Sequence, residues 1–368
     1  MTRPRTFRAP GRVNLIGEHT DYNLGFVLPI ALDRATFVET QPSGDAALHV
    51  WSDHYNEGRS WPIAAIDSLR RARHWSDYVA GVARQLTLRG VPIDPLALRI
   101  RSDVPEGSGV SSSAALEVSA ALALLQGREF DPLETARLCQ RAEVEFVGTP
   151  CGIMDQYVSV FGQAHAALKI DCRSLTHETV ALPRNVEIVA VNSMVKHELG
   201  ASAYRTRVEE CAIAVDSIHR GCPEVESLRD ATISHVEKTP MPRIIRRRAR
   251  HIVSENQRVE LFVNAAARGA LDRMGELFLE SHRSMQHDYE ITCDEVDFLV
   301  DTAVGIAGCY GARMTGGGFG GCTVNLVAPD AVERFSESIR TRYRERFSLD
   351  PAIFRCVPSE GASEVKFP

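Results

Sequence analysis

The sequence lacks the markers of a secreted, zinc-binding or membrane-spanning protein. Its nine cysteines are scattered and include no C-x-x-C pair, so neither a disulfide framework nor a zinc site is indicated. The N-terminal segment "MTRPRTFRAPGRVN" has no apolar stretch typical of signal peptides, and no run approaches the roughly 20 apolar residues of a membrane span. We therefore expect a cytoplasmic protein with reduced, mostly buried thiols and no membrane partner.

Concentrated positive charge is also scarce. The formal net charge is −6, and the densest basic run, Arg243 to His251, contains no interleaved aromatic residues. The continuation of this run has helical periodicity and balances the arginines with Glu255, Glu260 and Glu276. A solvated helix face explains the run better than a nucleic-acid contact, so we expect no nucleic-acid partner.

Length and pattern indicate two domains. A chain of 368 residues is longer than chains that usually fold around a single hydrophobic core, which predicts about two lobes and a cleft. The first half alternates strand-like runs such as "ALHVWSD" and "LALRIRS" with glycine and proline turns. After a further strand, "VEIVAVNS", helical periodicity dominates from Ser202 to about Val304, and strand-like sequence then returns. We predict an α+β fold with domains at 1–178 and 179–368.

The stretch "PEGSGVSSSAALEV", Pro105 to Val118, lies between a predicted strand and a predicted helix. The apolar residues of the helix form one stripe, made by Ala115, Val118, Leu122 and Leu125. The serines therefore stand at a helix start, where backbone N–H groups lack partners and the helix dipole favours anions. The stretch suits a phosphate loop, although serines that only cap the helix are the alternative. No G-K-[ST] or H-R-D sequence occurs, so a Walker A loop and a protein kinase are excluded.

A second glycine cluster, "TGGGFGG" from Thr315 to Gly321, formally matches G-x-G-x-x-G. A dinucleotide-binding fingerprint should open a helix, whereas "CTVNLVA" continues here as a strand. The cluster is therefore either a simple hairpin turn or a backbone that packs closely against a neighbouring loop or ligand, and we favour the close approach.

Two further stretches carry polar residues at close spacing. "APGRVNLIGEHTDYN" contains donors and acceptors suited to a polyol, although a solvated loop is equally compatible with it: Arg12, Glu18, His19, Asp21 and Tyr22. In "GTPCGIMDQYVSVFG", Asp155 stands in an otherwise apolar segment after Pro150 and Gly152, where a helix N-cap or a buried, hydrogen-bonded carboxylate would account for it.

Together and in this order, the four stretches resemble the galactokinases of the GHMP small-molecule kinase superfamily. "GRVNLIGEHTDYN" is similar to the galactokinase signature, "PEGSGVSSSA" to the superfamily's ATP loop and "MTGGGFGGCTV" to its third motif. "PCGIMDQ", "IDCRSL" and "ESHRSMQHDYE" also fall where galactokinases have similar runs, so the likeness spans nearly the whole chain. It implies a two-domain GHMP kinase fold with the active site in the cleft between the domains. It also implies ATP-dependent phosphorylation of the anomeric hydroxyl of D-galactose, with Mg²⁺.

The resemblance assigns roles to matching positions. Asp155 and Arg12 would be catalytic, and Ser113 with Glu143 would hold Mg²⁺. The ATP phosphates would contact Gly107, Ser108, Gly109, Val110, Ser111, Ser112 and Ser113, and Ser52 would touch the nucleotide. The sugar would contact Glu18, His19, Thr20, Asp21, Gly152 and Tyr204, with Glu18 facing the C6 hydroxyl.

Two other functions remain open on the sequence. One is a kinase for a related sugar, namely arabinose, N-acetylgalactosamine or galacturonate, and the other is a catalytically silent galactose sensor. The intact "SSSAA" run, with Asp155 and Arg12 present, argues against the sensor. We expect a small-molecule substrate and a monomer or weak oligomer.

Overall fold

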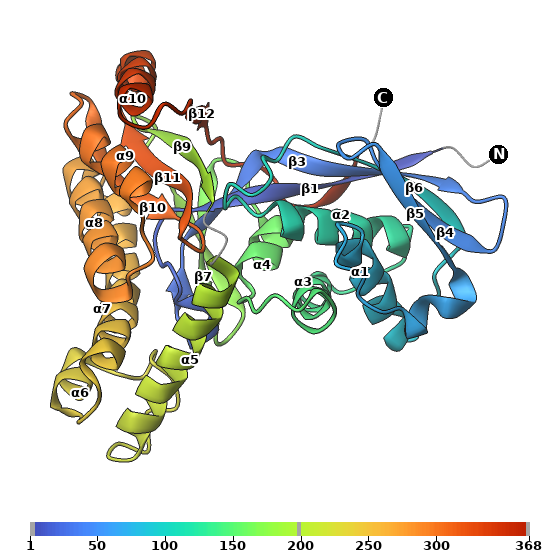
Figure 1. Ribbon diagram of the computed structural model, residues 1–368, viewed down its shortest axis with the longest axis horizontal. Helices are drawn as coiled ribbons and strands as arrows, with labels where there is room; N and C mark the ends of the chain where they lie inside the picture. Colours follow the sequence, from blue (N-terminus) through green and yellow to red (C-terminus); the bar gives the residue numbers. More distant parts are fainter. Residues whose placement is uncertain (1–3, 197–199, 366–368) are drawn as a thin grey trace.

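The computed structural model describes residues 4–196 and 200–365, which form three β-sheets with helices packed against them (Figure 1). The strands are β1 (Arg5–Asn14), β2 (Phe26–Val27), β3 (Pro29–Pro42), β4 (Ala47–Ser52), β5 (Glu57–Pro62), β6 (Leu96–Ser102), β7 (Ala166–Asp171), β8 (Thr176–Ala181), β9 (Glu187–Lys196), β10 (Cys309–Thr315), β11 (Gly320–Val327), β12 (Ala352–Arg355) and β13 (Ser363–Val365). The α-helices are α1 (Asp77–Leu88), α2 (Ser112–Leu125), α3 (Pro132–Arg141), α4 (Met154–Phe161), α5 (Gly200–His219), α6 (Ile233–Lys238), α7 (Arg243–Ala267), α8 (Leu271–Ser284), α9 (Asp294–Val304) and α10 (Val332–Phe347). Short 3-10 helices η1 (Asp21–Asn23), η2 (Ile63–Ser68) and η5 (Pro329–Ala331) and π-helical segments η3 (Ala142–Val147) and η4 (Met285–Tyr289) complete them.

The largest sheet has the strand order β13-β1-β3-β6-β4-β5, and its pairs are antiparallel except for β4 with β6. In β6, Leu96, Leu98 and Ile100 are buried while the residues between them are more exposed, which confirms the predicted alternation. This face packs against α1 and α2 in one apolar core. Helix α2 is buried around most of its circumference instead of along one stripe, because α1, α3 and α4 pack beside it as well as the sheet.

The four-stranded sheet, of order β10-β11-β9-β12, has helices on both faces. Alternate residues of β9 face opposite layers: Ile188 and Ala190 join a core with α7 and α8, whereas Val189 and Val191 join one with α9 and α10. The run "VEIVAVNS" is therefore a strand, as predicted, and it lies between β11 and β12; the helical region from Ser202 to Val304 forms α5 to α9.

The expected domain division cuts through an element. Strand β8 pairs with β7 in the three-stranded sheet β2-β7-β8, and the expected division at 178/179 falls within β8. Near its end the chain also returns to the first sheet, where β13 pairs with β1. The division 1–178 and 179–368 stays a prediction.

The basic run Arg243 to His251 opens α7, but a purely solvated face is wrong. The side chains of Arg248 and His251 are fully buried. The Arg248 guanidinium donates to Glu210 at 2.8 Å and to Glu290 at 2.6 Å. These acidic residues are 38 and 42 positions away in sequence, so the charges are compensated by partners that helical periodicity does not reveal.

All nine cysteines are described and all are free thiols, of which five are buried, in agreement with the expectation. Within residues 4–196 and 200–365, none of the helices combines the length and the apolar character needed to cross a bilayer.

Candidate active site

One large cavity brings together stretches that lie far apart in the sequence. It measures about 840 Å³ and is walled by β1, the β6–α2 loop, η3, the start of α4, α5 and the β10–β11 turn. Most residues predicted for the site line it: Arg12, Glu18, His19, Asp21, Ser52, Gly107, Gly109, Ser111, Ser112, Ser113, Glu143, Gly152, Asp155 and Tyr204. The four stretches singled out in the sequence therefore meet at one place.

Three predicted site residues lie behind this wall. Among the described residues, Thr20, Ser108 and Val110 are buried and do not line the cavity. The Thr20 hydroxyl is 2.6 Å from the carbonyl oxygen of Phe26, and the Ser108 hydroxyl donates to the carbonyl of Pro105 at 2.7 Å. Their predicted ligand contacts are therefore not supported by the positions of their side chains.

Arg12 on β1 and Asp155 on α4 line the cavity and form a bidentate ion pair. Nε and Nη2 of Arg12 donate to the two carboxylate oxygens at 2.8 and 2.7 Å, and Nη1 donates to the carbonyl of Gly109 at 2.5 Å. The Ser111 hydroxyl donates to the same carboxylate. Asp155 lies in the first turn of α4, after the N-cap Ile153, so the cap alternative is wrong and a hydrogen-bonded carboxylate at the cavity is what the fold produces.

The loop between β6 and α2 has the conformation that glycine permits. Gly107, Gly109 and Ser111 have φ values of 68°, 78° and 61°. Ser111 precedes the first residue of α2, and in the described structure its hydroxyl contacts Asp155 instead of capping a helix N–H. The side chain of Ser111 therefore does not cap α2, and the N–H groups of the first turn of α2 remain without intrahelical partners, as at any helix start.

The second glycine cluster forms the turn of the β10–β11 hairpin and packs against the first. A Cβ on Gly316 would lie 3.0 Å from the carbonyl oxygen of Gly109, and one on Gly321 would lie 3.3 Å from that of Ser108. The favoured interpretation, close backbone approach, is correct. The two glycine loops form one wall of the cavity.

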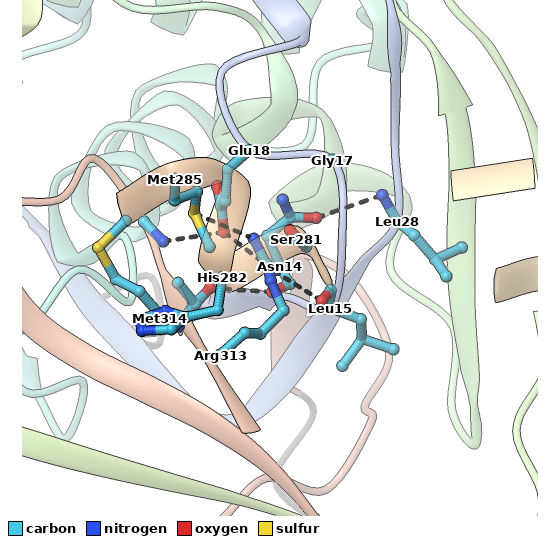
Figure 2. A network of polar contacts seen from close by, with 12 residues as sticks. Asn14, Leu15, Gly17, Glu18, Leu28, Ser281, His282, Met285, Arg313 and Met314 are labelled. Atoms are coloured by element: carbon cyan, nitrogen blue, oxygen red, sulfur yellow. Dashed lines mark hydrogen bonds and ion pairs between the residues drawn. The ribbon is translucent and has the colours of Figure 1, made fainter. Parts of the chain in front are cut away.

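Glu18 is held from behind by a network that the sequence did not reveal (Figure 2). Its Oε1 accepts from the N–H of Gly316 at 3.0 Å and lies 3.4 Å from the guanidinium of Arg313. Arg313 is fully buried and also donates to the carbonyls of Asn14 and Leu15. Burial raises the pKa of Glu18, against the opposing effect of Arg313.

Glu255 on α7 completes the network around Arg313. It accepts from the N–H of Gly17 at 3.0 Å and from the Ser281 hydroxyl at 2.7 Å, and it pairs with Arg258 at 2.7 Å. Although burial alone would raise the pKa of Glu255, Arg258 and its other cationic neighbours hold it below its usual range. The sequence had indicated Glu255 only as a surface charge balancing the arginines, and the fold buries it completely.

His19 occupies the cavity wall as a neutral imidazole. Its Nε2 is 3.2 Å from the carbonyl oxygen of Gly317, which can only accept, so Nε2 carries the proton. Nδ1 must then accept from the Tyr22 hydroxyl at 2.8 Å, and Tyr22 in turn contacts the Tyr289 hydroxyl at 2.7 Å. Burial lowers the pKa of His19 to about 3, which agrees with this tautomer.

Asp21 and Gly152 are matched in shape. A Cβ on Gly152 would lie 1.9 Å from Oδ2 of Asp21, so only glycine leaves room for this carboxylate. Burial, with the nearby charge of Asp155, raises the pKa of Asp21 to about 7. The carboxylate therefore titrates near neutrality in the absence of a partner.

Ser113 and Glu143 supply the type of donors that Mg²⁺ prefers. Both line the cavity, and the Ser113 hydroxyl contacts the Glu143 carboxylate, so two hard oxygens lie next to each other. Burial and the charge of Asp155 raise the pKa of Glu143 to about 7, an arrangement that a divalent cation would relieve. The donor set fits the ion.

Several lining residues were missed by sequence reasoning. The rings of Tyr55 and Trp75 stack with centroids 5.8 Å apart and an interplanar angle of 13°, and both line the cavity next to Ser52. They belong to two loops about 20 positions apart, and no local pattern pairs them. Gln156 and Glu117, buried beneath Glu143, were also missed.

Comparison with known proteins agrees with this geometry. Residues 2–42 match the model of the galactokinase galactose-binding signature, and 77–163 and 262–345 match the GHMP kinase N-terminal and C-terminal domains. A galactokinase of Roseiflexus sp. (strain RS-1) is 43% identical over 364 residues, covering 97% of this chain and 92% of that protein. The chain belongs to the galactokinase family.

Other galactokinases support the assignment. The galactokinase of Thermotoga neapolitana (strain ATCC 49049) is 37% identical, covering 97% of this chain and 99% of that protein. The crystal structure of Lactococcus lactis galactokinase complexed with galactose has a TM-score of 0.94 and 32% identity, covering 99% of this chain and 96% of that one. A mevalonate kinase, at 16% identity and a TM-score of 0.68, shares the fold alone. The expected GHMP kinase fold is confirmed, and this galactokinase-family chain is an enzyme.

Proposed function

We propose that the cavity around Asp155 is the active site, in which the chain transfers the γ-phosphoryl group of ATP to the anomeric hydroxyl of D-galactose. The products are galactose 1-phosphate and ADP. The observation that carries the proposal is the Arg12–Asp155 ion pair, which stands between the sugar-signature residues and the phosphate loop in one cavity. The similar galactokinase from Lactococcus lactis was solved with galactose bound.

The sugar lies against Glu18, Asp21 and Tyr204 in this proposal. Two carboxylates and a phenol offer the mixed acceptors and donors that ring hydroxyls need. Gly152 leaves space for Asp21, and the His19 ring supports the loop through Gly317. Glu18 faces the C6 hydroxyl and accepts a hydrogen bond from it.

The Asp155 carboxylate accepts a hydrogen bond from the anomeric hydroxyl. A carboxylate has about four acceptor positions, and Arg12 and Ser111 together use three of them. One position remains for the substrate hydroxyl, which orients its oxygen towards ATP. Because phosphoryl transfer passes through a loose transition state, orienting the hydroxyl contributes more than fully deprotonating it, and a carboxylate held in an ion pair is adequate.

The phosphates of ATP lie over the β6–α2 loop and the first turn of α2, where free N–H groups and the helix dipole favour anions. Arg12 stabilises the charge that develops on the transferring group. Ser113 and Glu143 would hold Mg²⁺, which when bound neutralises the phosphate charge. Ser52, Tyr55 and Trp75 provide a surface for the nucleotide base.

The alternatives, another sugar or a silent sensor, are not favoured, because curated galactokinases match over nearly the whole chain. A coupled ADP-release assay over a panel of sugars tests the function. We expect kcat/KM to be highest for galactose, lower for arabinose and lowest for galacturonate.

The order follows from Glu18. Arabinose lacks C6 and leaves a buried acceptor unpaired, a loss of roughly 1–3 kcal/mol. Galacturonate brings a second carboxylate next to a buried one, which costs more unless one of them is protonated. If galacturonate matched galactose, Glu18 would not be the C6 ligand. If no sugar led to ADP release, the proposed kinase activity itself would be refuted.

The monomeric or weakly oligomeric state and the cytoplasmic location stay predictions.

A further inference from the structure

A buried carboxylate that the proposed reaction does not use lies directly beneath the metal ligands. Glu117 is on α2, four positions and about one turn after Ser113, and its side chain is 0% exposed. Burying a carboxyl group in the protein interior costs free energy unless the group is hydrogen-bonded. Among the described residues, its Oε2 accepts from Gln156, which lies next to Asp155 in sequence, and its Oε1 has no hydrogen-bond partner.

The side-chain amide of Gln156 joins two carboxylates. Its Nε2 donates to Oε2 of Glu117 at 3.0 Å and to Oε2 of Glu143 at 2.7 Å. Both N–H bonds of the amide are therefore used. Rotating the amide by half a turn would place its oxygen against two carboxylate oxygens, so the pair of acceptors determines which way the amide points.

The same contact restrains Glu143. Its Oε2 also accepts from the Cys151 thiol at 3.7 Å, and its carboxylate contacts the Ser113 hydroxyl. Glu143 lies on the π-helical segment η3. This geometry is rare in proteins, and where it occurs it is often at a functional site. Gln156 thus holds the carboxylate from its buried side, while Ser113 and Cys151 contact it at the cavity wall.

We propose that Glu117 is a positioning residue for the metal site, acting through Gln156 to hold the Glu143 carboxylate in the orientation that binds Mg²⁺. This inference rests on the proposed function, which places the ion at Ser113 and Glu143. Glu117 acts as a hydrogen-bond acceptor and contacts neither ATP nor the sugar. Partners of this kind, one contact removed from a metal, are typically worth about 10–100-fold in metal affinity.

The test measures metal binding directly, with Mn²⁺ as the probe. Mn²⁺ bound to the enzyme with a non-hydrolysable ATP analogue and galactose is followed by electron paramagnetic resonance, with the analogue alone as blank. The variants are Glu117→Leu, which removes the acceptor, Gln156→Met, which removes the bridge, and Glu117→Gln, which keeps an acceptor oxygen. Leu124→Ala, a buried change elsewhere on α2, controls for lost stability.

We expect Glu117→Leu and Gln156→Met each to weaken Mn²⁺ binding by about 10–100-fold, and the double variant to be no weaker than either, because both act through one path. Glu117→Gln should restore the affinity. The KM for galactose should stay unchanged, and Leu124→Ala should lower the melting temperature without moving the Mn²⁺ affinity.

Other outcomes separate the two proposals. Unchanged Mn²⁺ affinity in Gln156→Met, or equal loss in Glu117→Gln and Glu117→Leu, would overturn the positioning role. If Glu117→Leu does not fold, Gln156→Met alone decides. Glu143→Gln tests the metal placement itself: no change in that variant would refute the proposed metal site, whatever the result at Glu117.

Discussion

Replacing Gly152 by alanine should damage sugar binding while leaving nucleotide binding intact. The new Cβ would lie 1.9 Å from Oδ2 and 2.2 Å from Cγ of Asp21, far below the 3.0 Å that real Cβ contacts keep. The carboxylate must therefore move by at least about 1 Å, a displacement of the size that can cost about 100-fold in an active site. Hydrogen bonds to a charged group are worth about 1.5–3 kcal/mol, which gives a similar figure.

The assay is coupled ADP release with galactose varied at saturating MgATP, and then with ATP varied. We expect kcat/KM for galactose to fall by about 10–100-fold and the KM for ATP to stay near its original value. Gly44→Ala is the matched control, because a Cβ there meets no heavy atom within 4 Å in the described structure. In an Asp21→Ala background, Gly152→Ala should cost little more, since the main clash is gone.

A wild-type kcat/KM for galactose in Gly152→Ala would refute the reasoning, because either the clash or the sugar contact of Asp21 would then be absent. A rise in the KM for ATP equal to the loss for galactose would point to movement of the whole loop before α4 instead of Asp21.

Four further predictions concern charge. Asp155→Asn should lower kcat by about 10²–10⁴-fold while calorimetry shows unchanged ATP binding, and wild-type turnover would exclude its assigned role. Because the pKa of Asp21 is raised to about 7 and the proposed sugar contact needs its ionised form, kcat/KM for galactose should fall as the pH drops through 7, and Asp21→Asn should lose this titration in a pH profile. Glu255 has a lowered pKa, so its contribution to stability is present above its unfolded value of 4.5 and is lost as the pH falls; in urea unfolding, Glu255→Gln should show a shallower loss of stability below that pH. Arg313→Met should lower the unfolding free energy by about 3–5 kcal/mol, because Glu18 and Glu255 lose a buried partner, and a stability equal to wild type would contradict that account.

The sequence alone determined the features that depend on neighbours along the chain. Alternation in "LALRIRS" identified β6, and glycines at positions needing positive φ, followed by serines, identified the loop before α2. The order of four such stretches was enough to show the resemblance to galactokinases, and it was this resemblance that predicted most of the cavity wall. The hairpin around Gly316 was also predictable, since "CTVNLVA" continues as a strand.

Tertiary structure alone decided which of these groups meet. Arg12 and Asp155 are 143 positions apart, and only the packing of β1 against α4 joins them. The same holds for Arg313 behind Glu18, for Gln156 between two carboxylates and for Arg248 inside the helical region, which the sequence had indicated as a solvated face. Periodicity reports which face of an element is apolar, but it does not report which polar side chain an opposing element supplies. A buried charge is stable only when such a partner arrives, so the compensation of these charges is a property of the assembled fold.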